Sequence, residues 1–489
     1  MSDKENENIM NKENENIMNK ENENIMNKEN ENIMNKENEN IMNKENENII
    51  NKENDIVVIG LGYVGLTLSV ALAESGFKVL GLEKRKDVVD LTNTGKAHFD
   101  ENGLDFALNK AVKNKFFTAT NEINDIKCSV YIITVGTPID QKGNIRLDYI
   151  ENATKEVAKS MKDDSLVILR STVKIGTSAN IVAKILKDTG KVFHLAMCPE
   201  RTLEGKALQE LTSLPQIIGS NSEQGFLRAE NIFGRLTKTI VKVSSLESAE
   251  IVKLIDNTYR DVQFAFANEV ARICEPFNVS ALEVISSGKL GYERTNVALP
   301  GLVGGPCLEK DPHILSQSLA EKGVEIEITR ACRVVNERQP YETVSNIKAE
   351  SIKRGFGEKI KITVMGLAFK GVPSTDDLRG SMVFKIFDAL NKDFKNSEIF
   401  IYDPIVSIES MKESFPEYII SKNMNNAIKN AHIVILANNH PNLTPSNIEK
   451  YYNNMNECGF IYDYWNRYTR LSKQQLNGNY FSVGYKGEL

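Results

Sequence analysis

The sequence predicts an α/β protein in which two parallel-sheet domains are joined by a long helix. Two groups of short β-branched runs, one after residue 54 and one after residue 360, alternate with helix-length segments. Between the two groups, an unusually long helical pattern extends from Glu247 to Glu275. The 489 residues suffice for two or three domains, each with a core of its own.

The composition excludes several classes of protein. Hydrophobic residues make up 41% of the chain and charged residues 26%, as in soluble globular proteins. No apolar run is long enough to cross a membrane, and the N-terminus lacks the apolar core of a secretory signal. The six cysteines and five histidines are scattered, with no CxxC pair and no metal-ligand spacing. We therefore expect a cytoplasmic protein with no metal site, no disulfide framework and no membrane span.

The N-terminal segment differs from the rest of the chain. An octapeptide, Met-Asn-Lys-Glu-Asn-Glu-Asn-Ile, is repeated in five identical copies from Met10 to Ile49. Residues 1–54 carry a net charge of −7, which leaves about +1 for residues 55–489. A polar, Asn-rich repeat cannot offset its ordering entropy, so we expect a disordered tail. The nearly neutral body gives no indication of a nucleic-acid surface.

The first strand leads into a glycine-rich turn. Residues 55–60 form a short apolar run, as a buried parallel strand does, and an amphipathic segment follows from Leu66 to Ser75. Strand, G-x-G-x-x-G and helix in this order form the dinucleotide-binding fingerprint. Gly60 makes the tight turn, Gly62 admits the pyrophosphate and Gly65 allows close helix packing. The expected cofactor contacts at this helix N-terminus are Gly60, Gly62, Tyr63, Val64 and Gly65.

An acidic residue completes the fingerprint. Glu83 stands 21 positions after Gly62, at the end of a second predicted strand over residues 76–82. A carboxylate there accepts hydrogen bonds from the ribose hydroxyls and repels a 2′-phosphate, which favours NAD. Lys84, Arg85 and Lys86 follow directly, so some tolerance of NADP stays open. We expect an N-terminal Rossmann domain that binds NAD.

Two further predicted strands, residues 129–134 and 165–170, extend the same sheet. Ligands bind at the carboxyl ends of strands in such sheets. Thr137 and Thr172 lie in the loops that follow these strands, so both are candidate contacts, although ordinary turn residues fit the pattern equally well.

The long helix and the last third of the chain supply polar side chains of their own. Lys253 and Asn257 are four residues apart in the helix and therefore share one face. Residues 361–366, 398–402 and 432–437 predict strands of a second, Rossmann-like α/β domain. Lys370 and Arg379 lie in the loop after its first strand, where cations can hold phosphates.

The segment Gly304-Gly305-Pro306-Cys307-Leu308-Glu309-Lys310-Asp311 contains a candidate nucleophile. Its glycines and proline are unsuited to a helix interior and leave the cysteine accessible. A thiolate needs nearby positive charge to be reactive at neutral pH, and Lys310 is close in sequence. A buried, inert cysteine is the competing interpretation.

Taken together, seven motifs in this order resemble the UDP-glucose/GDP-mannose dehydrogenase family over roughly residues 55–475. They are Gly60-x-Gly62-x-x-Gly65, Gly136-Thr137-Pro138, Ser171-Thr172-Val173, Pro199-Glu200-Arg201, Lys253-x-x-x-Asn257, Gly304-Gly305-x-Cys307-x-x-Lys310-Asp311 and Phe369-Lys370. The resemblance implies oxidation of a sugar C6 alcohol to a carboxylate with two NAD. It implies a cytoplasmic homodimer formed through the central helix, and a product that serves surface polysaccharide synthesis.

The resemblance also implies roles for single residues. Cys307 matches the nucleophile, which forms a thiohemiacetal and then a thioester. The residues that match its supporting catalytic groups are Lys253, Asn257, Asp311, Thr172 and Glu200. The residues that match substrate contacts are Glu200, Glu204, Lys253, Asn257, Arg294, Gly304 and Lys370. Arg379 and Thr172 match cofactor contacts.

The expected domains follow from the same comparison. They are a tail at 1–54, an NAD-binding domain at 55–245, a central helical domain with the cysteine at 246–345 and a UDP-sugar-binding domain at 346–489.

Two details bear on the sugar. Arg201 stands where UDP-glucose and GDP-mannose enzymes tend to have an aromatic or aliphatic residue, and the loop from Arg294 to Gly305 is similar to members that act on UDP-N-acetylhexosamines. We therefore expect UDP-ManNAc, then UDP-GlcNAc, with UDP-glucose as the alternative. A simple NAD-dependent 2-hydroxyacid or 6-phosphogluconate-type dehydrogenase and a non-catalytic NAD-binding protein are the competing classes.

Overall fold

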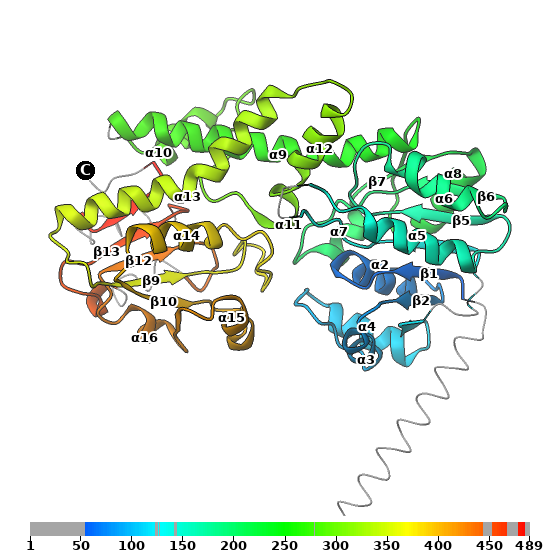
Figure 1. Cartoon of the computed structure of the whole chain (residues 1–489), viewed down its shortest axis with the longest axis horizontal. Coiled ribbons are helices and arrows are strands. Elements are labelled where there is room, and N and C mark those ends of the chain that lie inside the picture. Colours follow the sequence, from blue (N-terminus) through cyan, green and yellow to red (C-terminus); the bar gives the residue numbers. More distant parts are fainter. Residues whose placement is uncertain are drawn as a thin grey trace, which may run out of the picture.

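The computed structural model describes residues 54–122, 126, 128–140, 144–277, 279–443, 452–466 and 478–484. The predicted disorder of the repeat tail therefore falls outside the described residues. Two sheets form separate lobes that are joined by long helices (Figure 1). This is the α/β architecture with two Rossmann-like domains that the sequence predicts.

The first sheet has the order β3-β2-β1-β4-β5-β6-β7-β8, which contains the 3-2-1-4-5-6 order of dinucleotide-binding domains. Its strands are parallel except that β7 pairs antiparallel with β6. The strands are β1 (Ile56–Ile59), β2 (Val79–Leu82), β3 (Phe117–Thr120), β4 (Val130–Ile133), β5 (Ser165–Leu169), β6 (Phe193–Met197), β7 (Gln216–Ser220) and β8 (Ile240–Lys242). The helices are α2 (Tyr63–Glu74), α3 (Lys86–Asn93), α4 (Leu104–Lys113), α5 (Asp148–Ser160), the π-helical turn η1 (Ser178–Val182), α6 (Ala183–Lys187), α7 (Ala207–Ser213) and α8 (Glu223–Phe233).

The second sheet has the order β11-β10-β9-β12-β13-β14 and is parallel throughout. Numbered within its own lobe this is again 3-2-1-4-5-6. The strands are β9 (Lys361–Met365), β10 (Glu398–Tyr402), β11 (Ile419–Ile420), β12 (Ile433–Leu436), β13 (Phe460–Asp463) and β14 (Tyr480–Ser482). The helices are α14 (Val383–Asp393), α15 (Ile408–Ser414) and α16 (Met424–Ile428).

Both sheets are covered by apolar side chains on their two faces. In β1, Ile56 and Val58 enter one core cluster, while Val57 and Ile59 enter the cluster on the opposite face. Successive residues of a strand point to opposite faces, so a strand buried on both sides must be apolar at every position. This is why the predicted strands appear in the sequence as continuous apolar runs.

The helix α9 (Leu246–Cys274) belongs to the cores of both lobes. Near its beginning, Leu246 and Ala249 pack into a cluster of the first sheet. Near its end, Ala271 and Cys274 pack into a cluster of the second sheet. It runs along the top of both lobes in Figure 1, and it therefore fixes one lobe relative to the other.

The remaining central elements are η2 (Glu275–Phe277), α10 (Ala281–Lys289), α11 (Gly305–Leu308), α12 (Asp311–Ala320) and α13 (Glu327–Lys353). The helix α13 was not predicted, and it packs along α9. The domain boundary expected between residues 345 and 346 lies inside this helix, which continues to Lys353.

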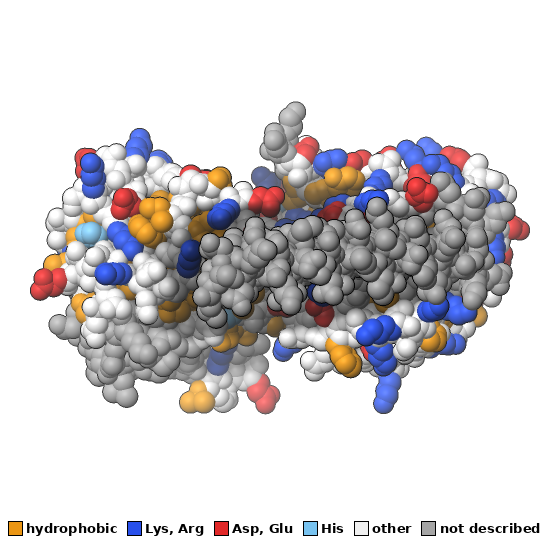
Figure 2. Space-filling model, turned by 90° about the horizontal axis from the view of Figure 1, so that it is seen from below, with side chains coloured by type: hydrophobic (Ala, Val, Ile, Leu, Met, Phe, Trp, Pro, Cys, Tyr) orange, Lys and Arg blue, Asp and Glu red, His pale blue; other side chains and the backbone are white. Residues whose placement is uncertain are grey.

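The surface shows no area dominated by one sign of charge on the face in Figure 2, where basic and acidic side chains are interspersed over the described parts of both lobes. None of the helices in the described ranges is long and apolar enough to cross a bilayer.

Candidate active site

Cys307 lies in α11, a single helical turn between the two lobes. Its side chain is exposed, whereas the neighbouring Gly305 and Leu308 are buried. Pro306 stands in the first turn of this helix, where its missing N–H leaves no intrahelical hydrogen bond unmade. Pro306 therefore suits its position at the start of this short helix.

The two glycines before Cys307 touch the second lobe. The backbone N–H of Gly305 donates a hydrogen bond to the carbonyl of Gly380 at 2.7 Å. A Cβ at Gly304 would lie 2.4 Å from that same carbonyl oxygen. A Cβ at Gly305, whose φ is +93°, would lie 2.4 Å from the ring of Phe369. No larger residue fits at either position without separating the cysteine turn from the second lobe.

Charged groups from several elements surround the thiol of Cys307. Solvent reaches the residue, but its sulfur lies among many neighbouring atoms, so desolvation is the largest effect and raises the pKa of the thiol. Asp311 and Glu204 also raise this pKa, whereas Lys253 and Lys310 lower it. Lys370 and Arg379 lie within the electrostatic range of the same thiol. The structure thus brings most of the expected catalytic and substrate residues to one place.

The side of the site formed by α9 and α12 carries three polar residues: Lys253, Asn257 and Asp311. Lys253 and Asn257 are buried on one face of α9, as their spacing predicts. The Asn257 amide donates to Asp311 Oδ2 at 2.5 Å. Asp311 is 0% exposed, and its Oδ1 has no hydrogen-bond partner in the described part of the chain, although Lys310 Nζ lies 3.8 Å away.

Glu200 and Glu204 lie on one loop but have different surroundings. The Glu200 Oε2 accepts two hydrogen bonds from the Arg170 guanidinium, at 2.9 and 2.6 Å, and its Oε1 accepts the backbone N–H groups of Arg201 and Thr202. Burial alone would raise the pKa of Glu200, but Arg170, the Thr202 N–H and Lys253 together hold this pKa below its ordinary value. Both oxygens of Glu200 are therefore occupied, and its carboxylate stays ionised.

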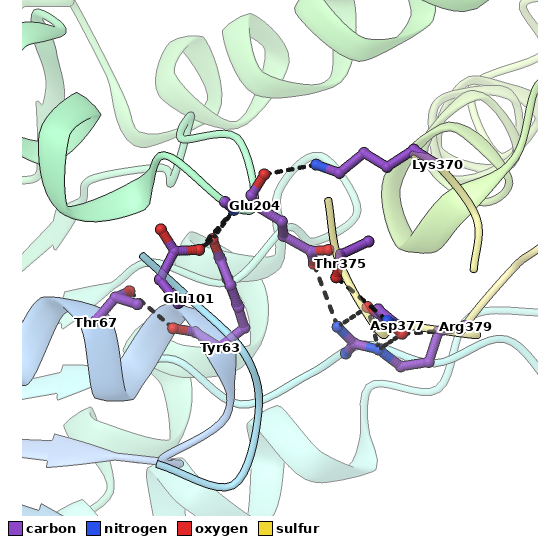
Figure 3. A network of polar contacts seen from close by, with 9 residues as sticks. Tyr63, Thr67, Glu101, Glu204, Lys370, Thr375, Asp377 and Arg379 are labelled. Atoms are coloured by element: carbon purple, nitrogen blue, oxygen red, sulfur yellow. Dashed lines mark hydrogen bonds and ion pairs between the residues drawn. The ribbon is translucent and has the colours of Figure 1, made fainter. Parts of the chain in front are cut away.

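Glu204 has one carboxylate oxygen without a hydrogen-bond partner among the described residues, and its pKa is raised. Its Oε1 accepts from Arg379 Nη2 at 3.3 Å, while its Oε2 is buried with no hydrogen-bond partner among the described residues. Burial, together with Asp377, raises the pKa of Glu204 to about 7. Lys370 donates to the Glu204 carbonyl at 2.6 Å, so the second lobe holds this residue at its backbone as well (Figure 3).

Arg201 connects the same loop to the long helix. Its guanidinium donates to Asp256 of α9 at 2.9 Å. Asp256 immediately precedes Asn257, so the charged residue at position 201 has a partner next to the site.

The threonines connect the cofactor loops to the cysteine turn. Thr137 Oγ1 donates to the carbonyl of Thr172 at 2.6 Å, and Lys310 Nζ donates to Thr137 Oγ1 at 3.1 Å. Thr137 is buried, and its hydroxyl both donates and accepts a hydrogen bond. The contact of Thr137 with Thr172 thus stabilises the two loops at the carboxyl ends of β4 and β5.

The glycine-rich turn between β1 and α2 has the geometry that a dinucleotide requires. Nothing lies within 4 Å of a Cβ built on Gly62, whereas a Cβ on Gly65 would lie 1.8 Å from the carbonyl of Gly60. Gly60 has φ +89°, as the tight turn demands. No side chain caps α2 at Gly62, which leaves the helix N-terminus, with Tyr63 and Val64 in its first turn, for an anion. These residues fit a bound NAD.

Glu83 lies at the end of β2, beside this turn. Its Oε2 accepts the N–H of Leu61 at 3.0 Å, and its Oε1 accepts the N–H of Arg85 at 3.1 Å. The carboxylate therefore stabilises the turn and stands where the ribose of a nucleotide would lie.

Arg294 is not joined to the other candidate residues. It is exposed in the segment between α10 and α11, and its guanidinium lies 4.8 Å from the ring centroid of Tyr292. In the described part of the chain no contact connects it to the Cys307 turn.

Two buried polar groups near the site were missed by the sequence reasoning. Glu101 accepts hydrogen bonds from the cofactor turn and from the Glu204 loop. Arg333 of α13 pairs with Asp261 of α9 at 2.6 Å and donates to the Leu308 carbonyl at 3.0 Å, which holds the cysteine turn from behind. Neither belongs to a sequence motif, because their partners are far away along the chain.

A hollow of about 800 Å³ lies between α9, α13 and the β13–β14 edge, but none of the candidate residues line it. Within the described ranges, no three His, Cys, Asp or Glu side chains gather as a metal site would require.

The opposing charges predict opposite effects of two variants on thiol reactivity. Lys253→Met removes a cation, so the pKa of Cys307 rises and its alkylation by iodoacetamide at pH 8 slows several-fold. Asp311→Asn removes an anion, so this pKa falls and alkylation becomes faster. Mass spectrometry of the Cys307 peptide measures both rates, and the exposed Cys458 serves as the internal control. Changes of the same sign in both variants would contradict the arrangement.

Known proteins resemble the chain along almost its whole described length. The models of the UDP-glucose/GDP-mannose dehydrogenase family match as the NAD binding domain at 54–237, the central domain at 247–338 and the UDP binding domain at 363–470. A UDP-N-acetyl-D-mannosamine dehydrogenase of Pyrococcus horikoshii is 32% identical over 81% of this chain and 91% of its own. One of Campylobacter jejuni is 33% identical over 71% of this chain and 86% of its own.

Solved structures of the same family have a similar fold. The solved structure of the UDP-ManNAc dehydrogenase from Pyrococcus horikoshii superimposes with a TM-score of 0.80 at 29% identity and covers 89% of this chain and 100% of its own. The chain therefore belongs to the UDP-glucose/GDP-mannose dehydrogenase family of NAD-dependent nucleotide-sugar dehydrogenases.

Proposed function

We propose that the enzyme oxidises the C6 hydroxyl of UDP-N-acetylmannosamine to a carboxylate, with two NAD consumed for each sugar. The observation that carries this proposal is the convergence of Lys253, Asp311, Glu204 and Lys370 on Cys307. The choice of sugar is supported by the names of the relatives in Pyrococcus horikoshii and Campylobacter jejuni.

The nucleophile accounts for the second oxidation. When bound, NAD supplies the hydride acceptor for both steps. An aldehyde is a poor hydride donor, but addition of the Cys307 thiolate gives a thiohemiacetal, whose oxidation yields a thioester. Lys253 lowers the pKa of the thiol and lies where it can stabilise an oxyanion beside the sulfur. Asn257, whose amide Asp311 orients, has the same task. Each such donor is worth about 3 kcal/mol in comparable sites.

Hydrolysis of the thioester needs a base, and Glu204 has the better properties for it. A general base is most effective when its pKa is near the working pH, and the pKa of Glu204 is about 7. Its Oε2 has no hydrogen-bond partner in the described residues, so it can accept a proton from water. Both Glu200 oxygens are occupied by Arg170 and backbone N–H groups, so we assign Glu200 a positioning role. Asp311, which already accepts from Asn257, is the alternative base.

The second lobe supplies cations for the nucleotide sugar. Lys370 and Arg379 lie at the carboxyl end of β9 and contact Glu204 from that side. Gly304 permits the backbone contact that keeps the cysteine turn against this lobe. We further propose the domain roles expected from the sequence: NAD at the first lobe and UDP at the second.

The alternatives are weaker. UDP-glucose and UDP-GlcNAc remain the alternative substrates. A single-step dehydrogenase would not require Cys307 among these charges, and a non-catalytic NAD-binding protein would require neither the thiol nor Glu204.

We also propose a homodimer formed through α9. Exposed apolar side chains recur along one side of this helix: Ile251, Ile255, Tyr259, Phe266 and Ile273. Such a stripe is costly in water and is typical of a self-complementary interface. The six free cysteines favour a reducing compartment, so we place the enzyme in the cytoplasm, where its product would serve surface polysaccharide synthesis.

The substrate proposal predicts a clear stoichiometry. Purified enzyme supplied with NAD should release two NADH for each UDP-ManNAc, and faster than with UDP-GlcNAc, UDP-glucose or GDP-mannose. NADH absorbance and mass spectrometry of the product measure both quantities. A preference for UDP-glucose would overturn the choice of sugar, and one NADH per sugar would overturn the four-electron reaction.

The dimer proposal predicts that one charge in the apolar stripe separates the subunits. Ile255→Glu should convert a particle of about twice 54.9 kDa into the single chain, as measured by light scattering after gel filtration. Phe106→Glu places the same charge on another exposed apolar residue, in α4, and should leave the mass unchanged. An Ile255→Glu variant that keeps the doubled mass would exclude α9 as the interface.

A further inference from the structure

Glu101 is a buried carboxylate that no motif of the sequence singles out. It lies between α3 and α4 and is 6% exposed. Its Oε2 accepts a short hydrogen bond from the Tyr63 hydroxyl and one from the Gly205 N–H at 2.6 Å. Its Oε1 accepts the N–H of Ala207, the first residue of α7, at 2.9 Å. Three donors from two separate segments thus converge on one buried anion. Figure 3 shows Glu101 beside Tyr63 and Glu204.

These donors belong to the cofactor-binding turn and to the loop that carries Glu204. Tyr63 is in the first turn of α2, directly after the glycine-rich cofactor turn. Gly205 and Ala207 follow Glu204 in the chain, so holding them fixes the backbone from which the Glu204 side chain extends. The Tyr63 ring is itself held against Phe99, with 5.1 Å between the ring centroids.

The Glu204 loop has little freedom on its other side. Gly205 has φ +86°, and a Cβ there would lie 2.6 Å from Pro373 of the second lobe. Lys370 donates to the Glu204 carbonyl, and Arg379, which Asp377 holds at 2.6 Å, donates to Glu204 Oε1. The loop is therefore held between Glu101 on the first lobe and these groups on the second.

We propose that Glu101 is a positioning residue, which fixes the Glu204 carboxylate beside Cys307 by holding its loop against the cofactor-binding turn. This rests on the proposed function in so far as Glu204 activates water. Glu101 itself does not reach the reacting atoms, because its oxygens are occupied by Tyr63, Gly205 and Ala207.

The charge of Glu101 also acts on its neighbours. Burial is the largest cause that raises the pKa of Glu204, and Asp377 and Glu101 raise it further. Arg379 and Lys370 lower it. Glu204 also lies within the electrostatic range of the Cys307 thiol and the Tyr63 phenol. Removing the negative charge at position 101 therefore lowers the pKa of Glu204.

The test is the pH dependence of turnover in Glu101→Gln. A base must be deprotonated, so turnover is lost as the pH falls through the pKa of Glu204. In Glu101→Gln we expect kcat to fall at least about 10-fold, because the loop is held less firmly, and the acid limb to move to lower pH, because a charge that raises the pKa of Glu204 is removed. Asp90→Asn makes the same carboxylate-to-amide change at an exposed site in α3 and should move neither quantity. A lower kcat with an unmoved acid limb would overturn the proposal.

Two further variants separate charge from position. Tyr63→Phe removes one donor but keeps the carboxylate, so its acid limb should stay in place; a shift equal to that of Glu101→Gln would contradict the account. Glu101→Asp keeps the charge but withdraws it by one methylene. It should lower kcat with an unmoved limb, and it tests the proposal if Glu101→Gln fails to fold; a kcat equal to that of the parent would overturn it.

The outcome can be distinguished from a failure of the proposed substrate. Turnover is measured with whichever nucleotide sugar the parent enzyme oxidises, so a wrong choice of sugar does not affect the comparison. Binding of NADH, followed by its fluorescence without any sugar, should be several-fold weaker in Glu101→Gln, because the amide offers one acceptor oxygen where three donors, including the Tyr63 hydroxyl, now share two. An unchanged NADH affinity would show that Glu101 does not act on the cofactor turn.

Discussion

The position of Cys307 depends on one close approach of two backbones. Gly305 donates to the carbonyl of Gly380 at 2.7 Å, and Gly304 lies so near that a Cβ would collide with the same oxygen. This contact holds the cysteine turn against the second lobe, while Arg333 holds it from the side of the central helices. Cys307 is therefore fixed where the three parts of the chain meet, and a larger residue at either glycine would separate them.

The charges around this turn act on the thiol of Cys307 in opposite directions. Burial and the carboxylates of Asp311 and Glu204 favour the neutral thiol of Cys307, whereas Lys253 and Lys310 favour the thiolate. These charged groups lie on different elements of the fold. A substrate that displaces one of them on binding would therefore change the pKa of the Cys307 thiol. Glu204 is held from the second lobe at two points, because Lys370 donates to its backbone carbonyl and Arg379 donates to its carboxylate.

The sequence predicted those features that short-range rules determine. The first strand, the glycine-rich turn and Glu83 follow from backbone needs within about thirty residues, and Lys253 and Asn257 from helix spacing. The helix α13 was missed because Pro340 interrupts its pattern and charged residues lie on most of its sides. The different surroundings of Glu200 and Glu204 could not be predicted, since they depend on Arg170 and Asp377, which are distant in sequence. Glu101 was missed for the same reason.

The proposed four-electron oxidation depends on Cys307 acting as a covalent nucleophile. The most direct measurement is the rate of uronate formation by Cys307→Ser and by the parent enzyme. The NADH affinity of both enzymes is measured as the control for folding. A serine hydroxyl has a far higher pKa than a thiol, so we expect NADH binding to persist and uronate formation to be abolished. Uronate formed at the parental rate would contradict it.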